Sequence, residues 1–243
     1  MFDAVFVSDI HLSTDVPART AVFVSFLRRL HTRKLYILGD LFDFWVGGDH
    51  ARLFHGSGLF DALTQLRADG TEIFILPGNR DFLISNTAPH IFPAEILPET
   101  HTINSPYGRT LLLHGDQLLL NDVGYTLFRF CSRQKVLRLL YLSLPLQLRL
   151  GIARIMRQQS KTAVKRKRNK NPRILQFSRY ALSSLLRQGF RCVVCGHIHR
   201  TSKFCFRVGN DTLHIYVLGQ WTQNGGDFLT LNSGRFVFHT FKA

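Results

Sequence analysis

Five short segments of this chain share one pattern, in which an apolar run ends in aspartate, histidine or asparagine, usually beside a glycine. They are Ser8–His11, Ile37–Asp40, Leu76–Asp81, Leu112–Asp116 and Cys195–His199. Each has the form of a buried strand that carries a metal ligand at its tip. One such run means little, but five in order predict a single site assembled from five strand ends.

The segments around these runs predict alternating strands and helices. Short buried strands are expected at Ala4–Ser8, Leu35–Leu38, Ile73–Leu76 and Thr110–Leu113. Helices are expected between them at Ala18–Leu30 and Leu59–Ala68. This alternation favours a layered α/β core. The strand pattern returns near the end of the chain, where we expect a second sheet to be closed by Arg191–Cys195, Leu213–Leu218, Phe228–Leu231 and Arg235–Thr240.

The middle of the chain has a different character. Leu127–Met156 is rich in Leu and Arg at helical spacing and predicts two helices broken near Pro145. Its most apolar part, Val136–Leu150, is too short and too often interrupted by Arg to span a bilayer. We therefore expect one domain over residues 1–243, with a mostly helical insertion at roughly 121–180 above the strand ends.

The positive charge of the chain is concentrated in that middle region. Residues 1–122 carry 9 Lys and Arg against 14 Asp and Glu, whereas residues 123–210 carry 20 Lys and Arg and no acidic residue. A stretch of this length with only positive charges indicates an anionic partner, either nucleic acid, an anionic membrane face or a phosphorylated substrate.

The five motifs supply seven candidate metal ligands with nitrogen and oxygen donors and no thiolate. They are Asp9, His11, Asp40, Asn79, His114, His197 and His199. This donor set suits Mn²⁺, Fe²⁺ or Zn²⁺ in five- or six-coordinate geometry and does not suit a structural tetrahedral zinc. Seven ligands suit two ions if one carboxylate bridges them. The i and i+2 spacing of Asp9 and His11 places both side chains on one face if the strand continues.

The ordered motifs resemble the calcineurin-like metallophosphoesterases, over almost the whole chain. Most of that superfamily has His where this chain has Arg80, and the block Gly78–Phe82 resembles one branch, the UDP-2,3-diacylglucosamine diphosphatases of lipid A biosynthesis. The resemblance implies a four-layer α/β/β/α sandwich with a helical cap insertion, and two Mn²⁺ ions. Asp9, His11, Asp40 and His199 would hold one ion. Asp40, Asn79, His114 and His197 would hold the other.

The same resemblance implies a set of substrate contacts. We expect them at Asn79, Arg80, Asp122, Tyr125, Arg157, Ser160, Lys167 and His197. The chain departs from the branch at Val164, where a polar contact is usual, at Ile174–Tyr180, and in the unusually basic run Lys165–Lys170. These departures concern the lipid and sugar contacts and leave the metal ligands intact.

Arg80 indicates which bond is cleaved. A His at this position could protonate an alkoxide leaving group, but Arg stays charged and cannot. Arg can still stabilise developing negative charge through paired N–H donors. A sugar phosphate needs no such proton, because the second pKa of a phosphate monoester is about 6. We therefore expect Asn79 and Arg80 to be catalytic in diphosphate hydrolysis; the alternative is that Arg80 only pairs with Asp81.

These features predict a hydrolase of a nucleotide-linked lipid, peripheral on the cytoplasmic face of the inner membrane and attracted to anionic lipid. We expect no nucleic-acid partner and no obligate protein partner. One alternative is a nuclease or nucleotide phosphodiesterase with the same metal centre, which the basic segment would suit. Against it, the segment offers Leu and Ile more than aromatic residues for base stacking. A second alternative, a non-catalytic scaffold, is disfavoured because all seven ligands are present.

Overall fold

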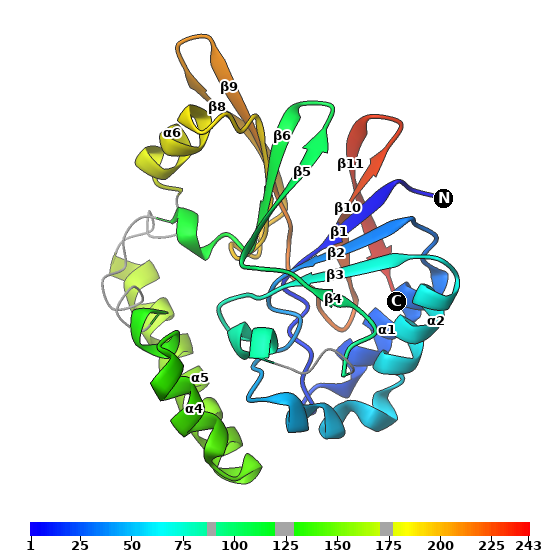
Figure 1. Ribbon diagram of the computed structural model, residues 1–243, viewed down its shortest axis with the longest axis vertical. Helices are drawn as coiled ribbons and strands as arrows, with labels where there is room; N and C mark the ends of the chain where they lie inside the picture. The colour runs from blue at the N-terminus through cyan, green and yellow to red at the C-terminus, as the bar shows by residue number, and fades with distance from the viewer. Residues whose placement is uncertain (87–90, 120–128, 171–176) are drawn as a thin grey trace.

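The computed structural model of this protein describes residues 1–86, 91–119, 129–170 and 177–243, with residues 86 and 161–170 described by their backbone only. Two β-sheets form its centre (Figure 1). No helix in the described part of the chain has the length and apolar character needed to cross a membrane.

The first sheet has six strands in the order β11-β10-β1-β2-β3-β4. The strands are β1 (Ala4–Val7), β2 (Lys34–Leu38), β3 (Glu72–Leu76), β4 (Glu95–Ile96), β10 (Gly225–Asn232) and β11 (Arg235–Lys242). Strands β1 to β4 are parallel, while β10 is antiparallel to β1 and to β11. Because β1, β2 and β3 are parallel neighbours, their carboxyl ends meet at one edge of the sheet.

The second sheet has five strands in the order β5-β6-β7-β9-β8. They are β5 (Thr100–Ser105), β6 (Gly108–Leu113), β7 (Cys192–Cys195), β8 (Ser202–Val208) and β9 (Asp211–Val217). The three central strands are parallel, and the edge strands β5 and β8 are antiparallel to their neighbours. The carboxyl ends of β6 and β7 therefore also lie together.

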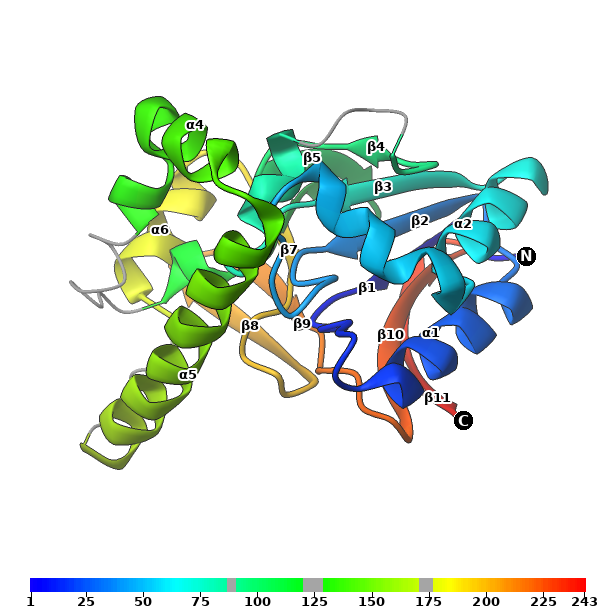
Figure 2. The same cartoon turned by 90° about the horizontal axis from the view of Figure 1, so that it is seen from below.

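Helices cover the outer faces of both sheets. Helices α1 (Pro17–Arg29) and α2 (Leu59–Ala68) pack on the first sheet through Phe23, Leu63 and their neighbours, and α6 (Arg179–Arg187) packs on the second through Leu182 and Leu186. A third apolar cluster, which includes Phe6 and Val194, fills the space between the sheets. The order of layers is therefore helix, sheet, sheet, helix, as expected from the sequence (Figures 1 and 2).

Two further helices stand beside this sandwich. Helix α4 (Lys135–Ser143) and helix α5 (Leu146–Lys170) are separated at Pro145, which confirms the predicted break. Three short 3-10 helices complete the described elements: η1 (Gly48–Ser57), η2 (Phe82–Asn86) and η3 (Asp116–Leu118). Figure 2 shows α5 running along the side of the molecule where the loops of the two sheets lie. The proposed limits of the insertion, 121 and 180, stay a prediction.

The predicted membership of the sheets was wrong for two strands. Strands β10 and β11 do not close the second sheet but extend the first, because β10 hydrogen-bonds along β1 with Val5 opposite Thr230. Strand β6, which the apolar pattern assigned to neither sheet, belongs to the second sheet. Apolar periodicity marks a strand and its buried face, but it does not say which neighbour completes its hydrogen bonds.

Candidate metal centre

The seven predicted ligands all follow strand ends. Asp9 and His11 follow β1, Asp40 follows β2, Asn79 follows β3, His114 follows β6, and His197 and His199 follow β7. The carboxyl ends of these five strands come from both sheets and face a common region, so the predicted convergence is found in the structure. Their role as metal ligands stays a prediction.

Left-handed backbone conformations bring several of these side chains together. Outside glycine, the described residues with positive φ are Asp9, His11, Asp40, His197, His199 and Ser233. All but Ser233 are predicted ligands. Such conformations cost of order 1–3 kcal/mol each and persist where the surroundings enforce them, typically at functional sites. The expectation that Asp9 and His11 share one face of a continuing strand was wrong, because β1 ends at Val7 and the two residues converge through these turns instead.

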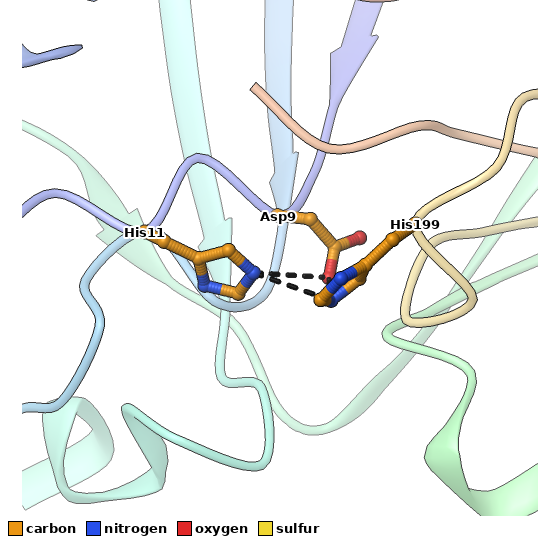
Figure 3. Close-up of side chains that lie close together, drawn as sticks. All are labelled: Asp9, His11 and His199. Atoms are coloured by element: carbon orange, nitrogen blue, oxygen red, sulfur yellow. Dashed lines mark hydrogen bonds and ion pairs between the residues drawn. The ribbon is translucent and has the colours of Figure 1, made fainter. Parts of the chain in front are cut away.

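The first group of ligands consists of Asp9, His11 and His199 (Figure 3). The Oδ1 atom of Asp9 lies 3.2 Å from Nε2 of His199 and 3.8 Å from Nε2 of His11. The two imidazole Nε2 atoms are 3.3 Å apart. The other oxygen of Asp9 accepts a hydrogen bond from the backbone N–H of His197 at 2.8 Å, which orients the carboxylate toward the two imidazoles.

The second group consists of Asn79, His114 and His197. The Oδ1 atom of Asn79 lies 2.9 Å from Nε2 of His114 and 3.0 Å from Nδ1 of His197, and these two nitrogens are 3.0 Å apart. Nδ1 of His114 lies 3.0 Å from the carbonyl oxygen of Leu38. Because a carbonyl only accepts, Nδ1 carries the proton in that bond and Nε2 is left free to bind an ion.

Asp40 lies between the two groups. Its Oδ2 atom is 3.8 Å from Nδ1 of His11 in the first group and 3.6 Å from Nε2 of His114 in the second. Its Oδ1 atom accepts a hydrogen bond from the backbone N–H of Arg80 at 3.0 Å. A carboxylate that contacts an ion in each group would lie in this position, and the bridging role of Asp40 stays a prediction.

Two buried oxygen atoms show that this pocket fits divalent cations. Oδ1 of Asp9 and Oδ2 of Asp40 are fully buried and accept no hydrogen bond, although Nε of Arg80 lies 3.2 Å from the latter without hydrogen-bond geometry. Leaving a charged oxygen unsatisfied in the interior is costly. Imidazole nitrogens surround both atoms at 3.2–3.8 Å. A cation that binds oxygen and nitrogen at about 2.0–2.2 Å fits between such groups.

The pKa values of the histidines reflect the same concentration of negative charge. Burial lowers the pKa of His114, but the carboxylates of Asp40, Asp9 and Asp116 outweigh it and raise that pKa to about 9. Burial and the neighbouring His114 lower the pKa of His197 to about 3. The carboxylates thus draw positive charge to the centre of the site, which is the charge that a divalent ion carries.

Arg80 points into this centre and does not pair with Asp81. Its Nη1 atom lies 2.9 Å from Oδ1 of Asp43 and 3.1 Å from Nδ1 of His11. The Asp81 carboxylate instead accepts the backbone N–H groups of Gly78, Asp40 and Phe42 at 2.7–3.3 Å, so it braces the loops that follow β2 and β3. Burial raises the pKa of Asp81 to about 6. The alternative role for Arg80 is therefore wrong.

The structure describes only some of the other predicted substrate contacts. Arg157 lies on α5 with Nε 3.0 Å from Oδ1 of Asp43, and Ser160 is exposed on the same helix. Asp122 and Tyr125 lie outside the described residues, as does the side chain of Lys167. Sequence reasoning missed Asp43. The available signal was an acidic residue within the apolar segment Leu41–Val46, where burial of a carboxylate requires a charged partner.

Replacement of Gly78 by Ala is expected to disrupt the centre. A β-carbon at residue 78 would overlap the carboxylate and the backbone nitrogen of Asp40. We expect Gly78→Ala to lower the free energy of unfolding by about 1–3 kcal/mol, as overpacking does, and to weaken metal binding. Thermal unfolding and Mn²⁺ titration calorimetry measure both effects.

The matched control for this prediction is Gly151→Ala on α5, where a β-carbon meets no atom within 4 Å. Alanine favours a helix over glycine by about 1 kcal/mol, so this control should be neutral or stabilising. If both variants bind Mn²⁺ as the wild type does, the tight approach of Gly78 to Asp40 has no role in metal binding.

Comparison with known proteins agrees with this geometry. A family profile described as calcineurin-like phosphoesterase matches residues 3–201. The chain belongs to this family. The family implies divalent metal ions, and two sets of described residues are close enough to hold them: Asp9, His11 and His199, and Asp9, Asp40 and His114.

The chain is also similar along most of its length to curated bacterial proteins with one name. It is 38% identical to the UDP-2,3-diacylglucosamine hydrolase of Aeromonas salmonicida over 90% of this chain and 86% of that protein. Identity to the proteins of the same name from Serratia proteamaculans and Haemophilus influenzae is 35%, over 92% and 96% of this chain and 92% and 97% of those proteins. A solved dimetal phosphatase from Danio rerio is 14% identical with a TM-score of 0.46, covering 99% of this chain and 96% of that one, which is too distant to inform function.

Proposed function

We propose that this protein hydrolyses the diphosphate of UDP-2,3-diacylglucosamine by attack of water, releasing UMP and 2,3-diacylglucosamine 1-phosphate in lipid A biosynthesis. The observation that carries the proposal is the convergence of seven N- and O-donor side chains, Asp40 at their centre, with the Arg80 guanidinium beside Asp40. The curated relatives that share the name UDP-2,3-diacylglucosamine hydrolase support the choice of substrate.

The cofactors in this proposal are two Mn²⁺ ions or similar divalent ions. Asp9, His11 and His199 would hold one, Asn79, His114 and His197 the other, and Asp40 would contact both. When bound, such ions neutralise phosphoryl charge and lower the pKa of water enough to make hydroxide available near neutral pH.

Arg80 and Asn79 are the proposed catalytic residues. The guanidinium of Arg80 is mostly buried, with 16% of the side chain exposed, and is held beside Asp40. In this environment its N–H donors can stabilise negative charge that develops on the diphosphate as the bond breaks. It donates no proton to a leaving group, which favours release of a phosphate over release of an alkoxide.

The helices beside the sandwich offer surfaces for the rest of the substrate. Leu142 and Tyr141 of α4 pack against the core, while Val136, Leu139 and Leu140 are 60–69% exposed. Arg157 supplies positive charge close to Arg80. We assign the acyl chains to the apolar side chains of α4 and α5 and the diphosphate to the two arginines.

One assay tests the proposal. Purified protein with Mn²⁺ is offered UDP-2,3-diacylglucosamine, single-stranded nucleic acid and bis(4-nitrophenyl) phosphate in parallel, and product release is followed. We expect UMP from the first substrate, abolished by EDTA and restored by Mn²⁺. Cleavage of nucleic acid in place of the first substrate would instead support the nuclease alternative.

We further propose that the protein acts on the cytoplasmic face of the inner membrane. The exposed apolar residues of α4 can enter an acyl layer while basic residues contact anionic headgroups, at roughly 1 kcal/mol for each Lys or Arg near the surface. We predict that vesicles containing anionic lipid raise the rate of UMP release more than neutral vesicles do. Leu139→Gln should reduce this activation, with exposed Leu53→Gln on η1 as the control. Equal rates with and without lipid would contradict the proposed location.

A further inference from the structure

We propose that Asp43 is a positioning residue that directs the Arg80 guanidinium toward the metal centre and links it to helix α5 through Arg157. This inference rests on the proposed function and extends it, because it connects the helix that is assigned to substrate binding with the group that is assigned to catalysis. Asp43 itself lies outside the seven predicted metal ligands.

Backbone hydrogen bonds place Asp43 beside the first ligand group. After β1 and β2 end, the two chain segments stay paired: the N–H of His11 donates to the carbonyl of Asp40 at 2.9 Å, and the N–H of Asp43 donates to the carbonyl of Leu12 at 2.9 Å. A parallel bridge between Leu12 and Phe42 lies in the same ladder. The backbone of Asp43 is therefore fixed by pairing with the segment that carries the predicted ligand His11.

The Asp43 carboxylate is shared by two guanidinium groups. Its Oδ1 atom lies 2.9 Å from Nη1 of Arg80 and 3.0 Å from Nε of Arg157, and its Oδ2 atom lies 3.1 Å from the same Nε. The three side chains are only 16–19% exposed. Charged hydrogen bonds in a mostly buried setting are stronger and more directional than those on a surface.

The Asp43 carboxylate allows two guanidinium groups to lie close together. The two guanidiniums repel each other, and the carboxylate between them offsets that repulsion. Asp43 alone carries one negative charge against the two positive charges that it contacts, so it does not cancel both of them. In addition, the two terminal nitrogens of Arg157 make no hydrogen bond to a described residue, so they can donate to a substrate while Nε is held by Asp43.

A second contact joins α5 to the segment that follows Asp40. Arg149, two helical turns before Arg157, is 4% exposed and donates to the carbonyl oxygens of Val46 and Leu144 and to the carboxylate of Asp49. The short segment after Asp40 thus holds α5 at two points. Because Arg149 fixes the helix near residue 46, contact between Asp43 and Arg157 transmits the position of α5 to Arg80.

A double-mutant cycle tests this inference. We compare Asp43→Asn, Arg80→Ala and the double variant with the wild type, measuring kcat and KM for UMP release and the Mn²⁺ affinity by calorimetry. Asp43→Asn is expected to lower kcat about 10- to 100-fold, as loss of a group that orients an active-site residue does, with a smaller rise in KM through Arg157 and nearly unchanged Mn²⁺ affinity. In the Arg80→Ala background the same substitution should have no further effect on kcat.

A separate set of variants tests the link between Asp43 and α5. Arg157→Gln is expected to raise KM, because Arg157 faces the substrate, and also to lower kcat. In the Asp43→Asn background only the effect on KM should remain. Asp61→Asn and Arg187→Gln make the same chemical changes at exposed positions of α2 and α6 and should match the wild type.

Each outcome decides the inference. An unchanged kcat for Asp43→Asn, a loss confined to KM, or additive losses in the double variant would overturn it. If the wild type releases no UMP but cleaves bis(4-nitrophenyl) phosphate, the proposed function fails, and the same cycle on that diester still tests Asp43. Additivity on the diester would overturn the inference in that case as well.

Discussion

Arg80→Ala is expected to abolish most hydrolysis while leaving metal binding intact. Arg80 contacts Asp40 and His11 at the edge of the metal centre, but its cationic guanidinium cannot coordinate an ion. The proposed role of this guanidinium is to stabilise negative charge on the diphosphate. Removal of one such preorganised donor typically costs about 100- to 1,000-fold in kcat.

Steady-state UMP release and Mn²⁺ calorimetry on the same preparation separate these two effects. Arg187→Ala on the exposed face of α6 is the control and should resemble the wild type. Arg80→Lys restores the charge without the planar fork, so we expect it to recover only part of the activity. Near-wild-type turnover by Arg80→Ala would falsify the catalytic role.

Asp40→Asn is expected to cause the larger loss. The Asp40 carboxylate faces both ligand groups, with Oδ2 3.8 Å from Nδ1 of His11 and 3.6 Å from Nε2 of His114. An amide oxygen carries no full charge and is a weaker bridge between two cations. Metal ions supply several kcal/mol of transition-state stabilisation, so loss of one should lower kcat by roughly 1,000-fold or more.

Metal content by mass spectrometry is the decisive readout for this variant. We expect two ions per wild-type chain and no more than one in Asp40→Asn, with Asp61→Asn as the unchanged control. Circular dichroism on the same sample checks that the variant is folded, because Asp40→Asn also removes the charge that faces the Arg80 guanidinium at 3.2 Å. Full occupancy by two ions together with normal turnover would remove Asp40 from the bridging position.

Much of the fold follows from local patterns in the sequence. Helix α2 spans Leu59–Ala68 as predicted, and α1 differs from its predicted range by one residue at each end. The buried strands β1 to β3 were found because they are short, continuous apolar runs. The edge strand β5 was missed because five of the six residues in its sequence THTINS are polar and its exposed and half-buried positions alternate.

The partners of each strand, in contrast, could not be predicted from periodicity. The apolar signal of a strand is the same in either sheet, so nothing local assigned β10 and β11 to the first sheet or β6 to the second. That choice is made by hydrogen bonding and packing between segments more than 220 residues apart, such as Phe6 and Leu229, which are paired in register.

For the site, the sequence alone determined which seven side chains come together, because each lies in a local motif where an apolar run ends in a polar residue. Tertiary structure alone decided how they gather. It turned Asp9, His11 and Asp40 through left-handed conformations, left one oxygen each of Asp9 and Asp40 without a hydrogen bond, and placed Asp43 between Arg80 and Arg157. The physical reason is that distances of a few ångströms between residues about 35 to 190 positions apart depend on sheet packing, which no local pattern encodes.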